Sequence, residues 1–71
     1  MSHGRVSKLF PDRDHGFLET PDGREIYFHR NSVLHPGFER LEIDTEVRFT
    51  EEAGEQGPQA STVAILGTSG L

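Results

Sequence analysis

The chain of 71 residues contains no cysteine. It can therefore form neither a disulfide nor a cysteine-ligated zinc site, and its composition fits a reducing compartment. No apolar run is long enough to cross a membrane, and the first residues lack the basic and apolar segments of a secretion signal. We expect one soluble, cytoplasmic domain, close to the smallest size at which a single hydrophobic core is sufficient.

Positive charge is also scarce. Seven lysine and arginine residues stand against twelve aspartate and glutamate residues, and the formal net charge is −5. This balance argues against binding nucleic acid through bulk electrostatic attraction. The excess of acidic residues lies after residue 38, whereas the part of the chain before residue 32 is neutral overall. Solubility of a small domain is an alternative explanation of the acidic composition.

Helical periodicity is missing as well, since no segment sustains it. Glycine and proline recur about every ten residues, which is typical of an all-β domain. Five strands in so short a chain predict a small closed barrel, because closure removes exposed strand edges. The expected strands cover residues 4–10, 15–20, 24–29, 45–52 and 60–66.

Turns and loops are expected between these strands. Pro21-Asp22-Gly23 predicts a tight hairpin turn, because Asp and Gly tolerate positive φ. Asn31 or Ser32 is expected to cap a single helical turn. Residues 36–44 and 53–59 are expected to be loops, the first of which carries Phe38.

Residues 4–66 are expected to form the domain. Residues 1–3 are interpreted as an N-terminal extension or a remnant of cloning, and residues 67–71 as a flexible tail or linker.

Alternation along the second and third strands divides their side chains between two faces. The aliphatic face is expected to belong to the core, which would contain Val6, Leu18, Ile26, Phe28, Val33, Val47, Phe49 and Val63. The opposite face would present His15, Phe17, Tyr27 and His29 to solvent. An exposed group of flat rings is unfavourable unless something covers it. Nucleobases are suitable partners, because each base stacked on an aromatic ring contributes roughly 1–3 kcal/mol. Stabilisation of the hairpin by its own cross-strand ring pairs is the alternative interpretation.

Several short motifs resemble those of bacterial cold-shock domains in their order and spacing. HGFLE (15–19) lies where that family has its first ribonucleoprotein-type motif, and IYFHR (26–30) lies where it has the second. HPGFERL (35–41) resembles the loop that presents one more phenylalanine, and GPQASTV (57–63) resembles the start of the last strand. The resemblance covers residues 4–66 and implies a five-stranded antiparallel barrel of the OB-fold type.

This resemblance implies a non-catalytic binder of single-stranded RNA or DNA that needs no cofactor and acts in the manner of an RNA chaperone. Bases would stack on rings, and polar side chains would contact phosphates or base edges. Carried over by position, the stacking residues are Phe17, Tyr27, His29 and Phe38. Arg13 falls at a usually basic position near the phosphates, and Gln59 lies where polar groups often contact a base.

Four positions depart from the usual pattern of the family. Lys8 replaces a stacking tryptophan, and His15 and Arg30 each replace a phenylalanine. Asp14 stands where glycine is common. Histidine still stacks, whereas Lys8 and Arg30 can contact phosphates, and Arg30 can also stack through its guanidinium plane. We therefore include Lys8, His15 and Arg30 in the predicted nucleic-acid-binding set.

Two other identities follow from the same residues. The run 23–34 is also similar to cold-shock domains fused to ribosome-hibernation-factor-like proteins, which would make ribosomal RNA the partner. Alternatively, the acidity and the replaced rings favour an acidic OB-fold module for protein interaction, with weak or lost nucleic-acid binding. If the chain binds nucleic acid, we expect it to be a monomer.

Catalysis and metal binding are not expected. His15 and His29 can approach each other across the hairpin, but no cysteine or carboxylate is placed to complete a tetrahedral site. The acidic residues are scattered and form no evident acid/base pair. The serines lack the context of a nucleophile.

Overall fold

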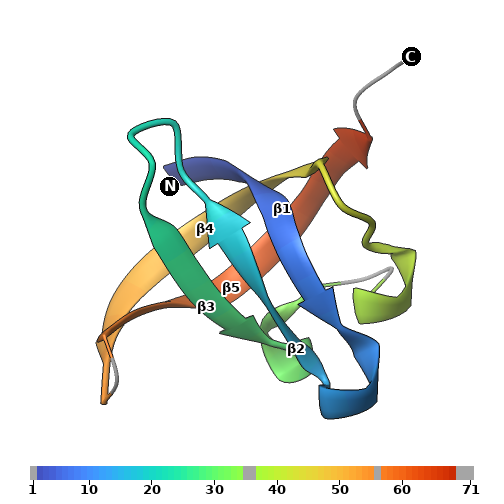
Figure 1. Ribbon diagram of the computed structural model, residues 1–71, viewed down its shortest axis with the longest axis horizontal. Coiled ribbons are helices and arrows are strands. Elements are labelled where there is room, and N and C mark those ends of the chain that lie inside the picture. The colour runs from blue at the N-terminus through green and yellow to red at the C-terminus, as the bar shows by residue number, and fades with distance from the viewer. Residues whose placement is uncertain (1, 35–36, 56, 69–71) are drawn as a thin grey trace.

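The computed structural model describes residues 2–34, 37–55 and 57–68, and these form a closed barrel with the strand order β1-β2-β3-β5-β4 (Figure 1). The expected all-β barrel is therefore confirmed. The strands are β1 (Ser2–Phe10), β2 (His15–Glu19), β3 (Glu25–His29), β4 (Thr45–Gly54) and β5 (Gly57–Thr68). Among the described residues, no helix is long and apolar enough to cross a membrane.

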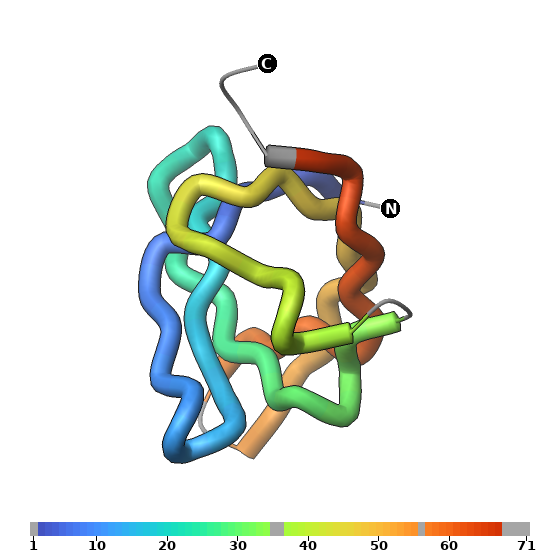
Figure 2. Tube along the Cα trace, turned by 90° about the vertical axis from the view of Figure 1, so that its right-hand side faces the viewer, coloured from blue at the N-terminus to red at the C-terminus, as the bar shows by residue number. Residues whose placement is uncertain are grey.

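Three short 3₁₀ turns connect the strands: η1 (Pro11–Arg13), η2 (Arg30–Ser32) and η3 (Phe38–Arg40). Figure 2 shows residues 37–44, coloured light green to yellow, running across the view between the blue trace of β1 and the red trace of β5. Leu34 and Val63 share a backbone hydrogen bond of 2.8 Å, which fixes the chain after η2 to β5. The barrel itself is closed by the pairing of β1 with β4, since β4 lies between β5 and β1 in the strand order.

One irregularity in β1 determines which of its side chains face outward. Val6 pairs with Leu18, but Lys8 pairs with Phe17, so Ser7 is an extra residue opposite the regular β2. The Ser7 hydroxyl donates to the Phe17 carbonyl at 3.2 Å. A bulge of this kind shifts the alternation of the strand by one residue. Val6 consequently points into the core, whereas Lys8 is exposed beside Phe17.

The core is the one expected from the alternation, with additions. Seven of the eight predicted core side chains are fully buried, and the eighth, Val33, is partly buried against them. The structure adds Phe38, Leu41 and Ala60 to this core. These three were missed because they lie in a predicted loop or at a strand end, where alternation gives no information.

Gly16 allows β1, β2 and a large core ring to approach closely. A Cβ atom at this position would lie 2.6 Å from the Lys8 carbonyl oxygen and 2.8 Å from Cζ of Phe28. Real Cβ contacts are longer, so only glycine fits without displacement of a neighbour. The Phe28 ring thus fills the space inside the barrel that a side chain at position 16 would need.

Several predicted boundaries are wrong. β1 begins at Ser2 and β5 ends at Thr68, each two residues beyond the strand predicted at that end. Most of the predicted loop 53–59 belongs to the β4–β5 hairpin, because β4 continues to Gly54 and β5 begins at Gly57. Gln56 of that loop, Pro36 of the other loop, and residues 1, 35 and 69–71 lie outside the described part of the chain.

The predicted helical turn after β3 exists as η2, but its cap differs from the prediction. His29 is the N-cap residue, and its ring Nδ1 accepts a hydrogen bond from the Asn31 backbone N–H at 3.1 Å. Neither Asn31 nor Ser32 precedes the turn, because both lie within it.

Candidate nucleic-acid interface

The outward side of the β2–β3 hairpin carries three rings in contact, those of His15, Phe17 and Tyr27, which we call the ring face. The prediction that this hairpin turns Leu18 and Ile26 inward is confirmed, since both are 0% exposed while the three rings are partly exposed. Phe17 and Tyr27 are direct register partners with ring centroids 5.9 Å apart. The His15 ring lies 5.4 Å from Tyr27 and 6.1 Å from Phe17.

The rings of the ring face have two orientations. His15 and Tyr27 are inclined to each other by only 36°, whereas Phe17 stands at 85° to His15 and 75° to Tyr27. The arrangement is therefore edge-to-face or tilted throughout, which aromatic pairs prefer. Phe17 thus stands across the rings of His15 and Tyr27, which lie on neighbouring strands.

Phe10, at the end of β1, packs against the ring face and was missed by the sequence analysis. Its ring centroid lies 5.0 Å from that of His15 and 6.3 Å from that of Phe17, and the residue is 37% exposed. The bulge at Ser7 places Phe10 on the same side as Lys8 and Phe17. A bulge cannot be read from alternation alone, so this position had no usable signal in the sequence.

His29 is the fourth ring that was expected on this surface. It is the register partner of His15 and is partly exposed, as predicted. Its Nδ1 is engaged as the cap of η2. Its ring forms no aromatic pair with the other rings among the described residues, so its place is at the edge of the ring face.

Phe38 corrects the prediction of a loop that presents one more ring. The residue is only 5% exposed, and its ring centroid lies 6.1 Å from that of Phe28 in the core. The Arg30 guanidinium carbon lies 5.0 Å from the ring centroid and covers it. The η3 turn directs the ring inward, because burial of a phenylalanine ring is more favourable than its exposure to water. In this arrangement Phe38 offers no free face to a base.

Arg30 is held by carboxylates. Its Nε donates to Asp14 Oδ1 at 3.0 Å, and its NH1 donates to Glu39 Oε1. Hydrogen bonds with Glu39 and then Asp14 raise the pKa of Arg30 above its ordinary value. The backbone hydrogen bond of Glu39 and the Arg30 guanidinium lower the pKa of Glu39. Asp14 adopts φ 60°, which explains why glycine is suited to its position. One cation thus faces two anions.

Lys8 and Arg13 are the other predicted basic contacts. Lys8 Nζ lies 5.6 Å from the Phe17 ring centroid, so it borders the ring face as expected, but it also pairs with Glu25 at 3.3 Å. Arg13 is exposed in η1, and within the described residues no carboxylate lies within 4.0 Å of its guanidinium. Arg13 is therefore the most available of the predicted cations.

Gln59 lies beside the ring face. It is paired with Tyr27 in the short parallel ladder between β3 and β5, and it is partly exposed. Its side-chain Oε1 lies close to Gly54, where a Cβ atom would come within 2.6 Å of it. The register thus places Gln59 on the strand beside Tyr27, with its amide oxygen near Gly54 of β4, and its contact with a base stays a prediction.

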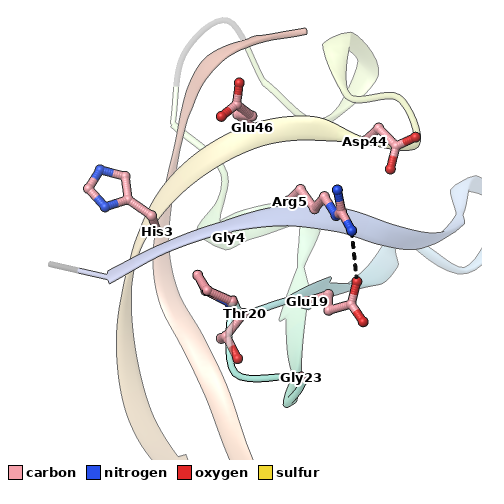
Figure 3. A pocket seen from close by; sticks show the side chains of 9 residues that line it. His3, Gly4, Arg5, Glu19, Thr20, Gly23, Asp44 and Glu46 are labelled. Atoms are coloured by element: carbon pink, nitrogen blue, oxygen red, sulfur yellow. Dashed lines mark ion pairs between the residues drawn. The ribbon is translucent and has the colours of Figure 1, made fainter. Parts of the chain in front are cut away.

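A groove at the other end of the β1–β2 pair is separate from the ring face. Its lining includes His3, Arg5, Glu19 and Asp44, and Figure 3 shows Arg5 and Glu19 pointing toward each other across the two strands. These two side chains form an ion pair of 3.5 Å. The β1–β2 register places Arg5 opposite Glu19 and Phe10 opposite His15, so the two surfaces lie at opposite ends of the pair.

The closed five-stranded barrel with rings on the outer side of adjacent strands defines a class of protein. Small barrels of the OB-fold type use such a strand face to bind oligonucleotides.

Comparison with known proteins identifies the family. Residues 2–66 match the sequence model of the 'Cold-shock' DNA-binding domain, and the chain belongs to this family. Similar proteins include cold shock protein 1 of Lactiplantibacillus plantarum, with 35% identity over 63 residues, which cover 89% of this chain and 96% of that protein. The major cold shock protein of Streptococcus pyogenes serotype M6 is 32% identical, with 93% and 98% covered. The cold shock protein CspB of Bacillus caldolyticus is 33% identical, with 93% and 100% covered.

Family membership confirms the resemblance inferred from the sequence and gives the general function. The chain is a non-catalytic domain of a nucleic-acid-binding family.

Proposed function

We propose that the ring face binds unpaired bases of single-stranded RNA or DNA by stacking. The observation that carries this proposal is the contact among His15, Phe17 and Tyr27 on the outer side of one hairpin, with centroids 5.4 to 6.1 Å apart. These rings are partly exposed, whereas Leu18 and Ile26 beside them on the same strands are fully buried. Stacking accepts any base, because every base has a π-face, so we expect modest sequence preference.

Polar groups around the rings complete the proposed site. Among the predicted cations, Arg13 is the one without an ion pair in the described part of the chain, so it is available to a phosphate. Gln59, the register partner of Tyr27, has an amide that can donate to or accept from a base edge. A base that is stacked on the rings cannot pair with another strand at the same time. The domain would therefore melt or prevent RNA secondary structure, in the manner of an RNA chaperone. We propose that it does so as a monomer in the cytoplasm. Ribosomal RNA is a narrower candidate ligand of the same kind.

The test is a titration of labelled oligo-dT and oligo-U followed by fluorescence anisotropy. Phe17→Ala should weaken binding by about 1–3 kcal/mol, which is a factor of roughly 5 to 150 in Kd. Leu66→Ala is the matched control, because Leu66 is also apolar and is 50% exposed but lies on β5 outside the ring face. Absence of binding at low salt with micromolar protein, or an equal loss in both variants, would contradict the proposal.

A second function is favoured by the pairing of Lys8 and Arg30 with carboxylates. A face whose cations are already neutralised suits a protein partner that covers the rings. In the self-association version, sedimentation should give a dimer whose formation Phe17→Ala prevents. A monomer at high concentration would contradict that version.

A further inference from the structure

We propose that Phe10 provides an additional subsite for a nucleobase, next to His15 at the β1 end of the ring face. This inference rests on the proposed function and extends the row of stacking rings from β2 and β3 to β1. Phe10 is the one exposed phenylalanine among the described residues, with an exposed fraction of 37%.

The ring orientations support this subsite. Phe10 is inclined to His15 by 38°, and His15 is inclined to Tyr27 by 36°, at centroid separations of 5.0 and 5.4 Å. The three rings come from β1, β2 and β3, which are neighbours in the barrel in that order. They therefore form a row across the strands, in which each ring is similarly inclined to the next.

Phe17 stands across this row. Its ring makes an angle of 85° with Phe10 and with His15. A base stacked on Phe10 would consequently lie roughly perpendicular to a base stacked on Phe17, so the two bases could not stack on each other. Phe10 would thus hold a separate nucleotide, and the bound strand must turn between the two positions.

A purely structural role explains Phe10 less well. Packing against His15 and Phe17 by edge and tilt contributes to the hairpin, but it leaves more than a third of the residue's surface in water. Its strand neighbour Leu9 is the side chain that packs against the core. Phe10 is therefore free to contact a ligand, and the flat face of a nucleobase suits an exposed aromatic ring.

The experiment compares Phe10→Ala and Phe10→Tyr in titrations with an oligo-dT series of increasing length. Phe10→Ala should leave the Kd of the shortest oligonucleotides unchanged and weaken those long enough to reach β1 by roughly 5- to 150-fold. Phe10→Tyr retains a flat ring and should restore the affinity. Leu66→Ala again serves as the control for removal of an exposed apolar side chain.

The outcomes separate this inference from the proposed function. Weaker binding of Phe10→Ala at long lengths only, with rescue by tyrosine, supports the subsite. An unchanged Kd at every length, or an equal loss at every length, overturns the subsite while Phe17→Ala still tests the ring face. If the wild-type protein did not bind any of the oligonucleotides, both the Phe10 subsite and the proposed function would be overturned. Thermal unfolding of each variant identifies a loss that comes from the fold, and the tyrosine variant then decides the question.

Discussion

If Lys8 contacts a phosphate in the proposed complex, Glu25 would compete for it, and removal of Glu25 should strengthen oligonucleotide binding. The Lys8–Glu25 pair is 3.3 Å long, and its side chains are 53% and 46% exposed. Exposed pairs of this kind contribute about 0.2–1 kcal/mol. A phosphate that takes Lys8 from Glu25 must first offset this amount. Glu25→Gln should therefore lower the Kd by a factor of about 1.5 to 5.

The salt dependence should change at the same time. A lysine that gains a phosphate contact adds up to about 0.7 to the slope of log K against log salt concentration for a single strand. The assay is an anisotropy titration of oligo-dT at several salt concentrations, with wild-type protein and variant side by side.

Glu19→Gln is a matched control for this experiment. Glu19 is the register partner of Glu25 on β2, so both variants remove one negative charge at neighbouring positions. Glu19 pairs instead with Arg5, in the groove at the opposite end of β1 from the ring face. An equal gain in affinity from both variants would refute the reasoning, because it would show a general effect of net charge. An unchanged Kd for Glu25→Gln would refute it as well.

Two further predictions concern stability. Gly16→Ala should destabilise the barrel by about 1–3 kcal/mol, since its Cβ would lie 2.6 Å from the Lys8 carbonyl. This corresponds to a loss in Tm of roughly 4–24 °C by circular dichroism, and an unchanged Tm would show that the neighbours move aside. Hydrogen bonds from Arg24 lower the pKa of Glu51, so this pair stabilises the fold above the unfolded-state pKa and is lost as pH falls through the folded-state value. The free energy of unfolding, measured by urea titration, should therefore fall less between pH 7 and about pH 3 in Glu51→Gln than in the wild-type protein. An equal fall in both proteins would contradict this.

The orientation of the side chains in the β2–β3 hairpin was predictable, because it depends on a local sequence pattern. Alternation of apolar and polar residues on two strands joined by a tight turn fixes which side chains share a face, so Leu18 and Ile26 could be placed inside and Phe17 and Tyr27 outside. The core followed from the same rule. Its missing member Leu41 lies after η3, where no periodic pattern operates.

The rest of the site depends on contacts between distant segments. The bulge at Ser7 decides the direction of Phe10, and an extra residue in one strand is apparent only once its partner is known. The expected exposure of Phe38 was wrong because η3 folds back onto the core. The ion pairs of Arg30 span 9 and 16 residues, so the sequence could identify a cation at this position but not the carboxylates that engage it.

The neutralised cations around the rings have a consequence for discrimination between ligands. Duplex DNA offers a protein mainly its phosphates, because its bases are stacked within the helix. With Lys8 and Arg30 engaged by carboxylates, this acidic barrel has little with which to attract such a ligand. In the proposed binding mode, only nucleic acid with accessible bases would offer the rings a partner for stacking. Intramolecular charge pairing would thus make the domain selective, with weak binding to double-stranded nucleic acid and stronger binding to single strands.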